Sequence, residues 1–202
     1  IIDIILKKDK NQGTNGTLTA NVAQGVYPKA GAGISVNHRN KKINIFGGYN
    51  YNYRMGFNDL RLYRSFFDEG QRTGAYDQRN YLKIPYHFNM GRIGIDYNIS
   101  PNTIIGVLAS GNLNRFKPHG ENRSKVEDGN QDVISSFRTT NMSSDIWPSY
   151  SFNGNIKHTF PKNKIELSAD VDYAKFWNDT EQRFTTLYYD VNGVEFLAQY
   201  LL

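Results

Sequence analysis

Three carboxylates at alternating positions are the residues of this chain whose spacing could most directly support chemistry. Glu166, Asp170 and Asp172 could together bind a cation, or two of them could act as a carboxylate pair. Every second residue of a β-strand faces the same side, so the same spacing is also typical of a polar strand face solvated by water. We favour the solvated face.

The other candidate motifs lack the residues or the spacing of a known metal or phosphate site. Residues 127–132 (EDGNQD) faintly resemble a calcium loop but lack its bidentate Glu and its spacing. His38, His87, His119 and His158 have no paired spacing for zinc. The chain has no cysteine and no phosphate-binding Gly-Lys-Ser/Thr loop. We therefore predict no metal, no cofactor and no enzymatic activity.

Composition narrows the classes of partner. The chain has 202 residues, a hydrophobic content of 39% and a mean hydropathy of −0.61. It has no apolar run of the length that a membrane-spanning helix needs, although barrel strands spread their apolar residues over alternate positions. The net charge is +5, but the charges are scattered, which argues against nucleic acid as a partner. Without an initiator Met or a leader at Ile1, we expect a chain cut from something longer.

The clearest alternation lies in residues 42–54, KINIFGGYNYNYR. One face is aliphatic and then aromatic, and the other carries mainly amides and charge. A soluble sheet can alternate in this way, but tyrosines at one end of an apolar face are typical of the aromatic girdle of a membrane barrel. We predict that the interface aromatics are Tyr49, Tyr51, Tyr53, Tyr97, Tyr173 and Trp177. The predicted lumen-facing polar residues are Asn50, Asn52, Glu166, Asp170 and Asp172.

The connections between alternating segments differ in length. Further strands are predicted at 14–24, 30–39, 84–99, 104–116, 150–160, 165–177 and 194–202, with the one after 165 able to continue towards Tyr189. A phase slip near Gly91 predicts a β-bulge. Tight turns are expected at 39–42, 100–103 and 161–164, and long loops at 55–82 and 117–145. Alternation of short turns with long loops is typical of outer-membrane barrels, whereas soluble sandwiches have shorter strands.

The first long loop carries the candidate ligand contacts. They are aromatic and arginine residues close together in sequence: Phe57, Arg61, Tyr63, Arg64, Phe66 and Phe67. Exposed aromatics beside arginines suit recognition of a sugar, a peptide or a siderophore. A loop packed over a barrel mouth or on its neighbour is the simpler interpretation.

Four segments resemble one family. Residues 1–22 (IIDIILKKDKNQGTNGTLTANV) resemble the junction of plug and barrel in TonB-dependent receptors, most closely the outer-membrane β-barrel family common in Bacteroidetes. Residues 43–54, 91–111 and 165–179 are similar to barrel strands of that family. The resemblance implies that residues 1–13 end a plug and that 14–202 form the first seven or eight strands of a barrel with about 22. The chain departs from the family in lacking most of the plug, a TonB box and the closing strands.

The expected fold is therefore all-β: an antiparallel up-and-down meander forming part of a transmembrane β-barrel in the bacterial outer membrane. We expect an open sheet with Thr14–Gln24 and the last strand as edges and Ile1–Lys8 off the meander. The resemblance implies import of a scarce nutrient (siderophore, glycan or peptide), with outer-membrane lipid and the TonB energy-coupling complex as partners. Two alternatives stay open: a soluble or surface-attached all-β binding module, and a small closed barrel with a structural or adhesive role.

Overall fold

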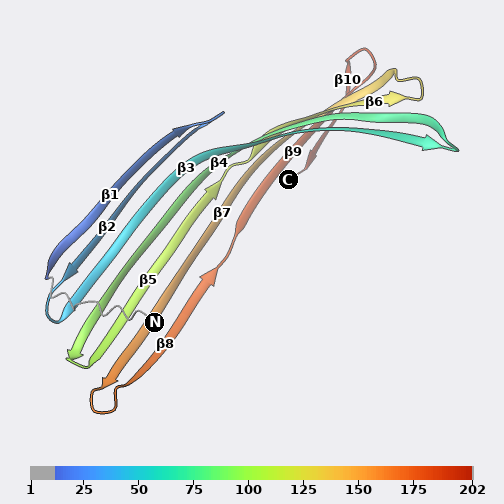
Figure 1. Cartoon of the computed structure of the whole chain (residues 1–202). Helices are drawn as coiled ribbons and strands as arrows, with labels where there is room; N and C mark the ends of the chain where they lie inside the picture. Colours follow the sequence, from blue (N-terminus) through green and yellow to red (C-terminus); the bar gives the residue numbers. More distant parts are fainter. Residues whose placement is uncertain (1–11, 202) are drawn as a thin grey trace, which may run out of the picture.

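The computed structural model describes residues 12–201 as one antiparallel β-sheet, without a helix in that range (Figure 1). This confirms the predicted all-β antiparallel class. The strands are β1 (Gly13–Gln24), β2 (Pro28–Arg39), β3 (Ile43–Asp68), β4 (Gln71–Ser100), β5 (Thr103–Phe116), β6 (His119–Asp128), β7 (Val133–Phe160), β8 (Ile165–Phe176), β9 (Asp179–Tyr189) and β10 (Glu195–Leu201). The expectation for Ile1–Lys8 lies outside the described residues.

The sheet is an up-and-down meander with two interrupted strands. Its order is β1-β2-β3-β4-β5-β7-β9-β10, while β6 pairs with β4 and β7, and β8 pairs with β7. β6 continues the register of β5 on both neighbours, and β9 continues that of β8 on β7, so the ten strands make eight passes. The expected seven or eight strands correspond to these passes. In the described range β1 pairs only with β2 and β10 only with β9, so both are edges, as expected.

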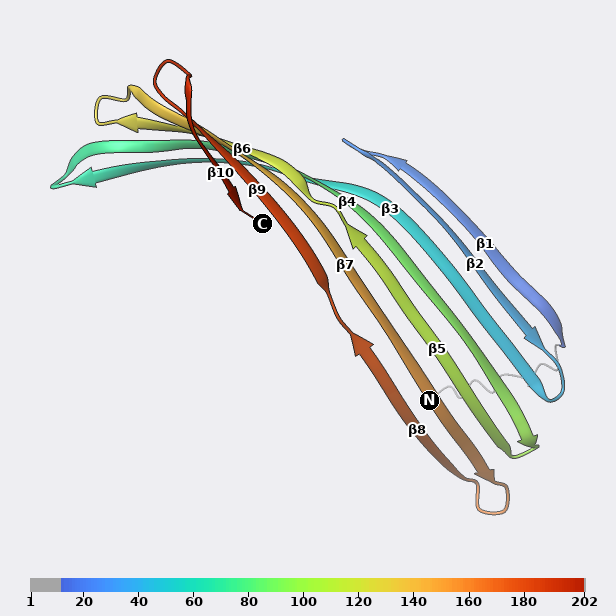
Figure 2. The ribbon, with the colours of Figure 1, turned by 180° about the vertical axis from the view of Figure 1, so that it is seen from behind.

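The two predicted long loops are wrong, because both stretches are strand. β3 and β4 pair from Ile43 opposite Tyr97 out to Asp68 opposite Gln71. β6 and the first part of β7 occupy most of the second stretch. Polar and aromatic residues stand on both faces there, so the alternation disappears although the backbone ladder continues. Figures 1 and 2 show these paired strands projecting beyond β1 and β2 at one end of the sheet. We call them the distal hairpins.

The predicted bulge at Gly91 is also wrong. The β3–β4 register passes through Gly91 without a shift, and its one irregularity lies between Phe66 and Phe67. Phe88 and Met90 therefore belong to the face opposite Ile93. The apparent phase slip arises because the apolar residues of β4 change from one face to the other near Gly91, without an inserted residue.

Short polar residues close the turns. Glu69 and Gly70, between β3 and β4, have φ of 45° and 81°, the left-handed values of a tight hairpin turn. The Asn40 side-chain oxygen accepts hydrogen bonds from the backbone N–H groups of Lys42 and Ile43, each at 2.8 Å. Asp190 does the same for Asn192 and Val194 at 2.9 and 2.8 Å. These side chains replace backbone partners that a turn cannot offer.

A staggered line of prolines crosses the sheet at the breaks of the two interrupted strands: Ser143 of β7 pairs with Pro118, and Pro148 lies five residues further along β7, opposite Leu113. Pro85 in β4, Pro118 between β5 and β6, and Pro148 in β7 lie in neighbouring strands, and each lacks a ladder N–H. Backbone hydrogen bonds still reach the carbonyl oxygens of all three prolines, from Lys117 to Pro85 at 3.2 Å, from Ser143 to Pro118 at 2.7 Å and from Trp177 to Pro148 at 3.3 Å. We call this line the proline crease, and the distal hairpins lie beyond it.

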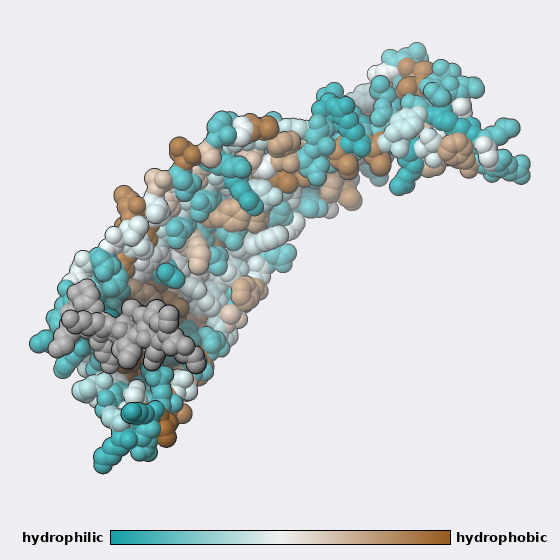
Figure 3. Space-filling model, in the orientation of Figure 1, coloured by the Kyte–Doolittle hydropathy of each residue, from teal (hydrophilic) through white to brown (hydrophobic). Residues whose placement is uncertain are grey.

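The sheet is a single layer with almost no core. Among the described residues only two hydrophobic side chains, Ala75 and Phe116, are buried. Figure 3 shows one face, on which teal and white surface predominates over the sheet and brown surface is scattered. A domain normally buries an apolar face against a second layer, and the described residues supply none.

Candidate functional site

The first candidate site is an extended apolar face, which the strand register defines. One row of directly opposite residues is Val36, Gly47, Ile93, Ala109, Phe152 and Tyr173. The next is His38, Ile45, Ile95, Val107, Gly154 and Val171. Directly opposite residues share a face, so these rows form one continuous surface. Ile93, Leu167 and Val171 on it are 63%, 62% and 74% exposed.

Aromatic side chains lie at both ends of the apolar face. Towards the distal hairpins, Tyr49 donates a hydrogen bond to Asn89 at 2.6 Å, and Tyr51 bonds with His87 at 2.9 Å. Trp177 packs against Tyr150 there, with ring centroids 5.9 Å apart.

At the end with the tight turns, Tyr97 lies opposite Ile43, and His158 packs against Phe160 at 4.4 Å. The sequence predicted Tyr49, Tyr51, Tyr53, Tyr97, Tyr173 and Trp177 as one class. The register brings all six onto one face: Tyr49, Tyr51, Tyr53 and Trp177 lie towards the distal hairpins and Tyr97 at the turn end. Tyr173 lies between these levels, in the row of Ile93 and Phe152.

The opposite, polar face carries all five residues predicted to be polar and lumen-facing. Asn50 and Asn52 lie opposite Gly33 and Gly31, and a Cβ on either glycine would overlap the asparagine above it. The glycines therefore make room for amides that lean across the neighbouring strand.

The three carboxylates of the polar face bond separately. Asp172 accepts a hydrogen bond from Asn153 at 2.8 Å, and Glu166 pairs with Lys157 at 2.7 Å. Asp170 lies opposite Asn155. In the described range, no three acidic or histidine side chains gather in a way that could hold a metal ion. The arrangement is that of a hydrated polar surface.

An aromatic cluster that the sequence did not predict lies on the polar face. Tyr86 and Phe88 stack at 5.7 Å with planes 8° apart, and the Arg54 guanidinium lies 4.7 Å from the Tyr86 ring. Phe116 packs edge-on against both rings and lies 4.6 Å from Trp147. Its signal in the sequence is the alternation of Tyr86, Phe88 and Met90, which share one face because the register continues through Gly91 without a bulge.

The six candidate ligand-contact residues do not come together. Three of them lie on the face of β3 that continues the apolar face: Phe57, Arg61 and Tyr63. Arg64 and Phe66 lie on the opposite face. Phe57 packs on Tyr27 from the β1–β2 turn at 5.9 Å, and Phe66 packs on Tyr76 at 5.2 Å. Phe67 is exposed beside the turn. The segment is a continuously paired strand whose two faces carry different side chains.

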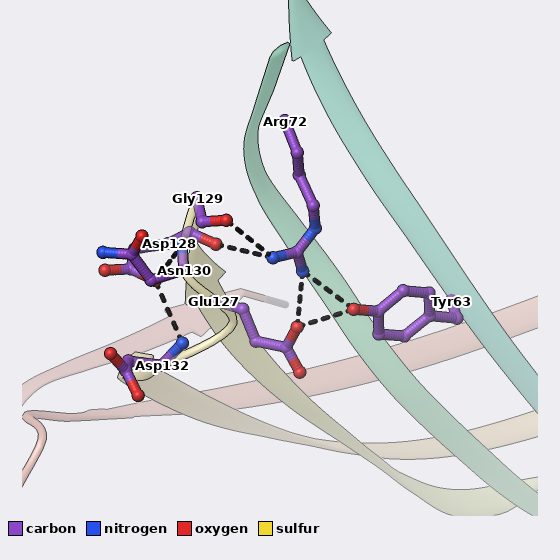
Figure 4. Close-up of polar contacts among 7 residues, drawn as sticks. All are labelled: Tyr63, Arg72, Glu127, Asp128, Gly129, Asn130 and Asp132. Carbon is purple, nitrogen blue, oxygen red and sulfur yellow. Dashed lines mark hydrogen bonds and ion pairs between the residues drawn. The ribbon is translucent and has the colours of Figure 1, made fainter.

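Polar contacts join the tips of the two distal hairpins (Figure 4). Tyr63 donates a hydrogen bond to Glu127 at 2.6 Å, and Arg72 pairs with the same carboxylate oxygen at 2.7 Å. Arg72 also donates to the carbonyl oxygens of Asp128 and Gly129 at 3.0 and 3.3 Å. Chiefly through the Tyr63 hydrogen bond, and then through Arg72, the pKa of Glu127 is held below its ordinary value of 4.5. The same hydrogen bond raises the pKa of Tyr63 above 10.0.

The acidic segment 127–132 is used by its own turn. Asp128 accepts backbone hydrogen bonds from Asn130 at 2.8 Å and Asp132 at 3.0 Å (Figure 4). This is an Asx-type turn, which accounts for the sequence pattern without a bound cation.

Comparison with known proteins adds no assignment, because no family model and no curated protein matches the chain. Within residues 12–201, no helix is long and apolar enough to cross a membrane. The function is therefore argued from the two faces of the sheet.

Proposed function

We propose that this chain is a stretch of a bacterial outer-membrane β-barrel, with its apolar face towards lipid and its polar face towards the lumen. The observation that supports it is a single-layer sheet whose apolar face is not covered by any residue of the range 12–201. Soluble proteins rarely expose an apolar patch larger than a few hundred Å². Hydrocarbon would cover this face without a second protein layer.

The extent of the apolar face suits a bilayer. From Ile43 to Tyr53, β3 covers about 34 Å at about 3.4 Å per residue, or about 24 Å of depth at a tilt of about 45°. The apolar band of outer-membrane barrels is about 25 Å tall, with aromatic girdles at both interfaces. Tyr49, Tyr51 and Tyr53 would then form one girdle, and Tyr97 would lie in the other.

Within this class we propose a TonB-dependent receptor that imports a scarce nutrient. The support is the resemblance of residues 1–22, 43–54, 91–111 and 165–179 to the Bacteroidetes family, together with the open meander, which would leave edges for further strands. The proposed partners are outer-membrane lipid, the TonB energy-coupling complex, and a small-molecule, glycan or peptide substrate. We propose no catalytic role and no cofactor.

The two tryptophans of the chain provide a test of the lipid-facing assignment. Trp177 packs with Tyr150 on the apolar face, whereas Trp147 packs with Phe116 on the polar face. The full-length protein, carrying only one of these tryptophans at a time and phenylalanine at all its other tryptophan positions, is reconstituted into vesicles of brominated phosphatidylcholine. We expect bromine to quench Trp177 fluorescence several-fold more than Trp147 fluorescence.

Equal quenching, or recovery of the native protein in the soluble fraction, would refute the barrel and favour the soluble module. The receptor class is tested separately, by binding of the full-length protein to the purified periplasmic domain of TonB. A lipid-embedded protein that does not bind this domain would favour the small barrel.

A further inference from the structure

Four arginines form a row across the distal hairpins. Arg61 lies directly opposite Arg79, Arg79 opposite Arg123, and Arg123 opposite Arg138. All four are exposed and share the face that continues the apolar face. Adjacent strands are about 4.8 Å apart, so the row spans about 14 Å.

Such a row is unfavourable without anions, because like charges directly opposite each other destabilise a sheet. Two carboxylates offset part of the charge. Asp59 accepts two hydrogen bonds from Arg79, at 3.0 and 3.1 Å. Glu121 pairs with Arg123 and lies 3.9 Å from Arg138. No described carboxylate forms an ion pair with Arg61, so four guanidinium groups face two carboxylates.

A hollow beside the row adds one further cation, Lys83. It has a volume of about 520 Å³, and its lining also includes Arg79 and Arg123 of the row and the carboxylate of Glu121. Lys83 also lies 5.6 Å from the ring of Tyr27. The planar guanidinium fork matches the oxygens of a phosphate group in a bidentate way, and lysine binds phosphate as a point charge.

We propose that the arginine row and this hollow bind a ligand carrying two or more phosphate groups. A single phosphate would contact two neighbouring arginines at most, whereas the row is about 14 Å long. The ligand is either a soluble polyphosphorylated molecule or the phosphorylated headgroup of a membrane glycolipid. This proposal is argued from the strand register and the charges of the side chains, so it does not depend on the receptor proposal.

The first test measures tripolyphosphate binding to the purified full-length protein by titration calorimetry. The variant combines Arg123→Gln with Arg138→Gln, and we expect affinity to fall about tenfold or more. Arg64→Gln is the matched control, because Arg64 lies in the same strand as Arg61 but on the other face. This control keeps wild-type affinity. If the double variant does not fold, Arg61→Gln replaces it, because that side chain is exposed.

The second test distinguishes the two sources of phosphate. The same proteins are mixed with phosphatidylcholine vesicles, with and without a bisphosphorylated glycolipid. Binding that requires the glycolipid, falls in the double variant and is displaced by tripolyphosphate assigns the site to a headgroup. Tripolyphosphate binding without vesicle binding assigns it to a soluble ligand. Absence of tripolyphosphate binding, or equal loss in Arg64→Gln, overturns the proposal.

Discussion

Replacing Val171 by arginine tests the division of the sheet into two faces. Val171 lies opposite Gly154 on the apolar face and is 74% exposed, while the next residue, Asp172, lies on the polar face and accepts a hydrogen bond from Asn153. In the proposed barrel, Val171→Arg places a charge in lipid, and Asp172→Arg places it in a wet lumen. The two substitutions introduce the same side chain at adjacent positions of one strand.

The magnitude follows from the position of Val171 along β8. From Ile165 to Val171 the strand covers about 20 Å, which at a tilt of about 45° is about 14 Å of depth. This is close to the middle of an apolar band about 25 Å tall, where an arginine costs about 2–4 kcal/mol. That cost reduces the ratio of folded to unfolded protein about 30- to 700-fold. A lumen position carries no comparable cost.

The assay compares both variants and a Val171→Ala control in the full-length protein. Folded barrel is measured in isolated outer membranes by heat-modifiable electrophoretic mobility, and unfolding is followed in urea after reconstitution in lipid. We expect Val171→Arg to lose most of its folded form, while Asp172→Arg and Val171→Ala stay near wild type. Equal loss in the two arginine variants would refute the assignment of faces to lipid and lumen.

Two further predictions concern packing and pH. A Cβ on Gly120 would lie 2.6 Å from the Tyr81 carbonyl oxygen, while one on Gly154 meets no atom within 4 Å. Gly120→Ala should therefore lower the free energy of unfolding, measured in urea, by about 1–3 kcal/mol. Gly154→Ala should lower it by less than about 0.5 kcal/mol. Because the folded pKa of Glu127 is below 4.5, its stabilisation is present above pH 4.5 and disappears as pH falls through the lowered pKa. Hydrogen-exchange protection of the 129–132 turn should fall in that window for wild type but not for Glu127→Gln, and an unchanged wild-type profile would contradict the role of this carboxylate.

The sequence was sufficient where the two faces differ in polarity. The alternation of residues 43–54 predicted which side chains share a face, and the register agrees: Ile45 lies opposite Ile95, and Asn44 lies opposite Asp96. Beyond Arg54 both faces carry polar and aromatic residues, so period-two reasoning failed although backbone pairing continued. The pairing of these strands can nevertheless be traced in the sequence once the turn at Gly70 is known, because Arg61 and Arg79 lie at equal distances on either side of it. That turn was the missing signal for the arginine row.

The proline crease gives the distal hairpins a long lever arm. From Pro85 to Gln71, β4 extends about 48 Å beyond the crease at about 3.4 Å per residue. A rotation of only about 10° about the crease therefore displaces the hairpin tip by about 8 Å. Rotation there would break fewer ladder hydrogen bonds than elsewhere, because Pro118 and Pro148 have no N–H to donate. Because the Arg72–Glu127 ion pair joins the two tips, such a rotation would displace both together, while the pairing across Ile45, Ile95 and Val107 lies on the other side of the crease.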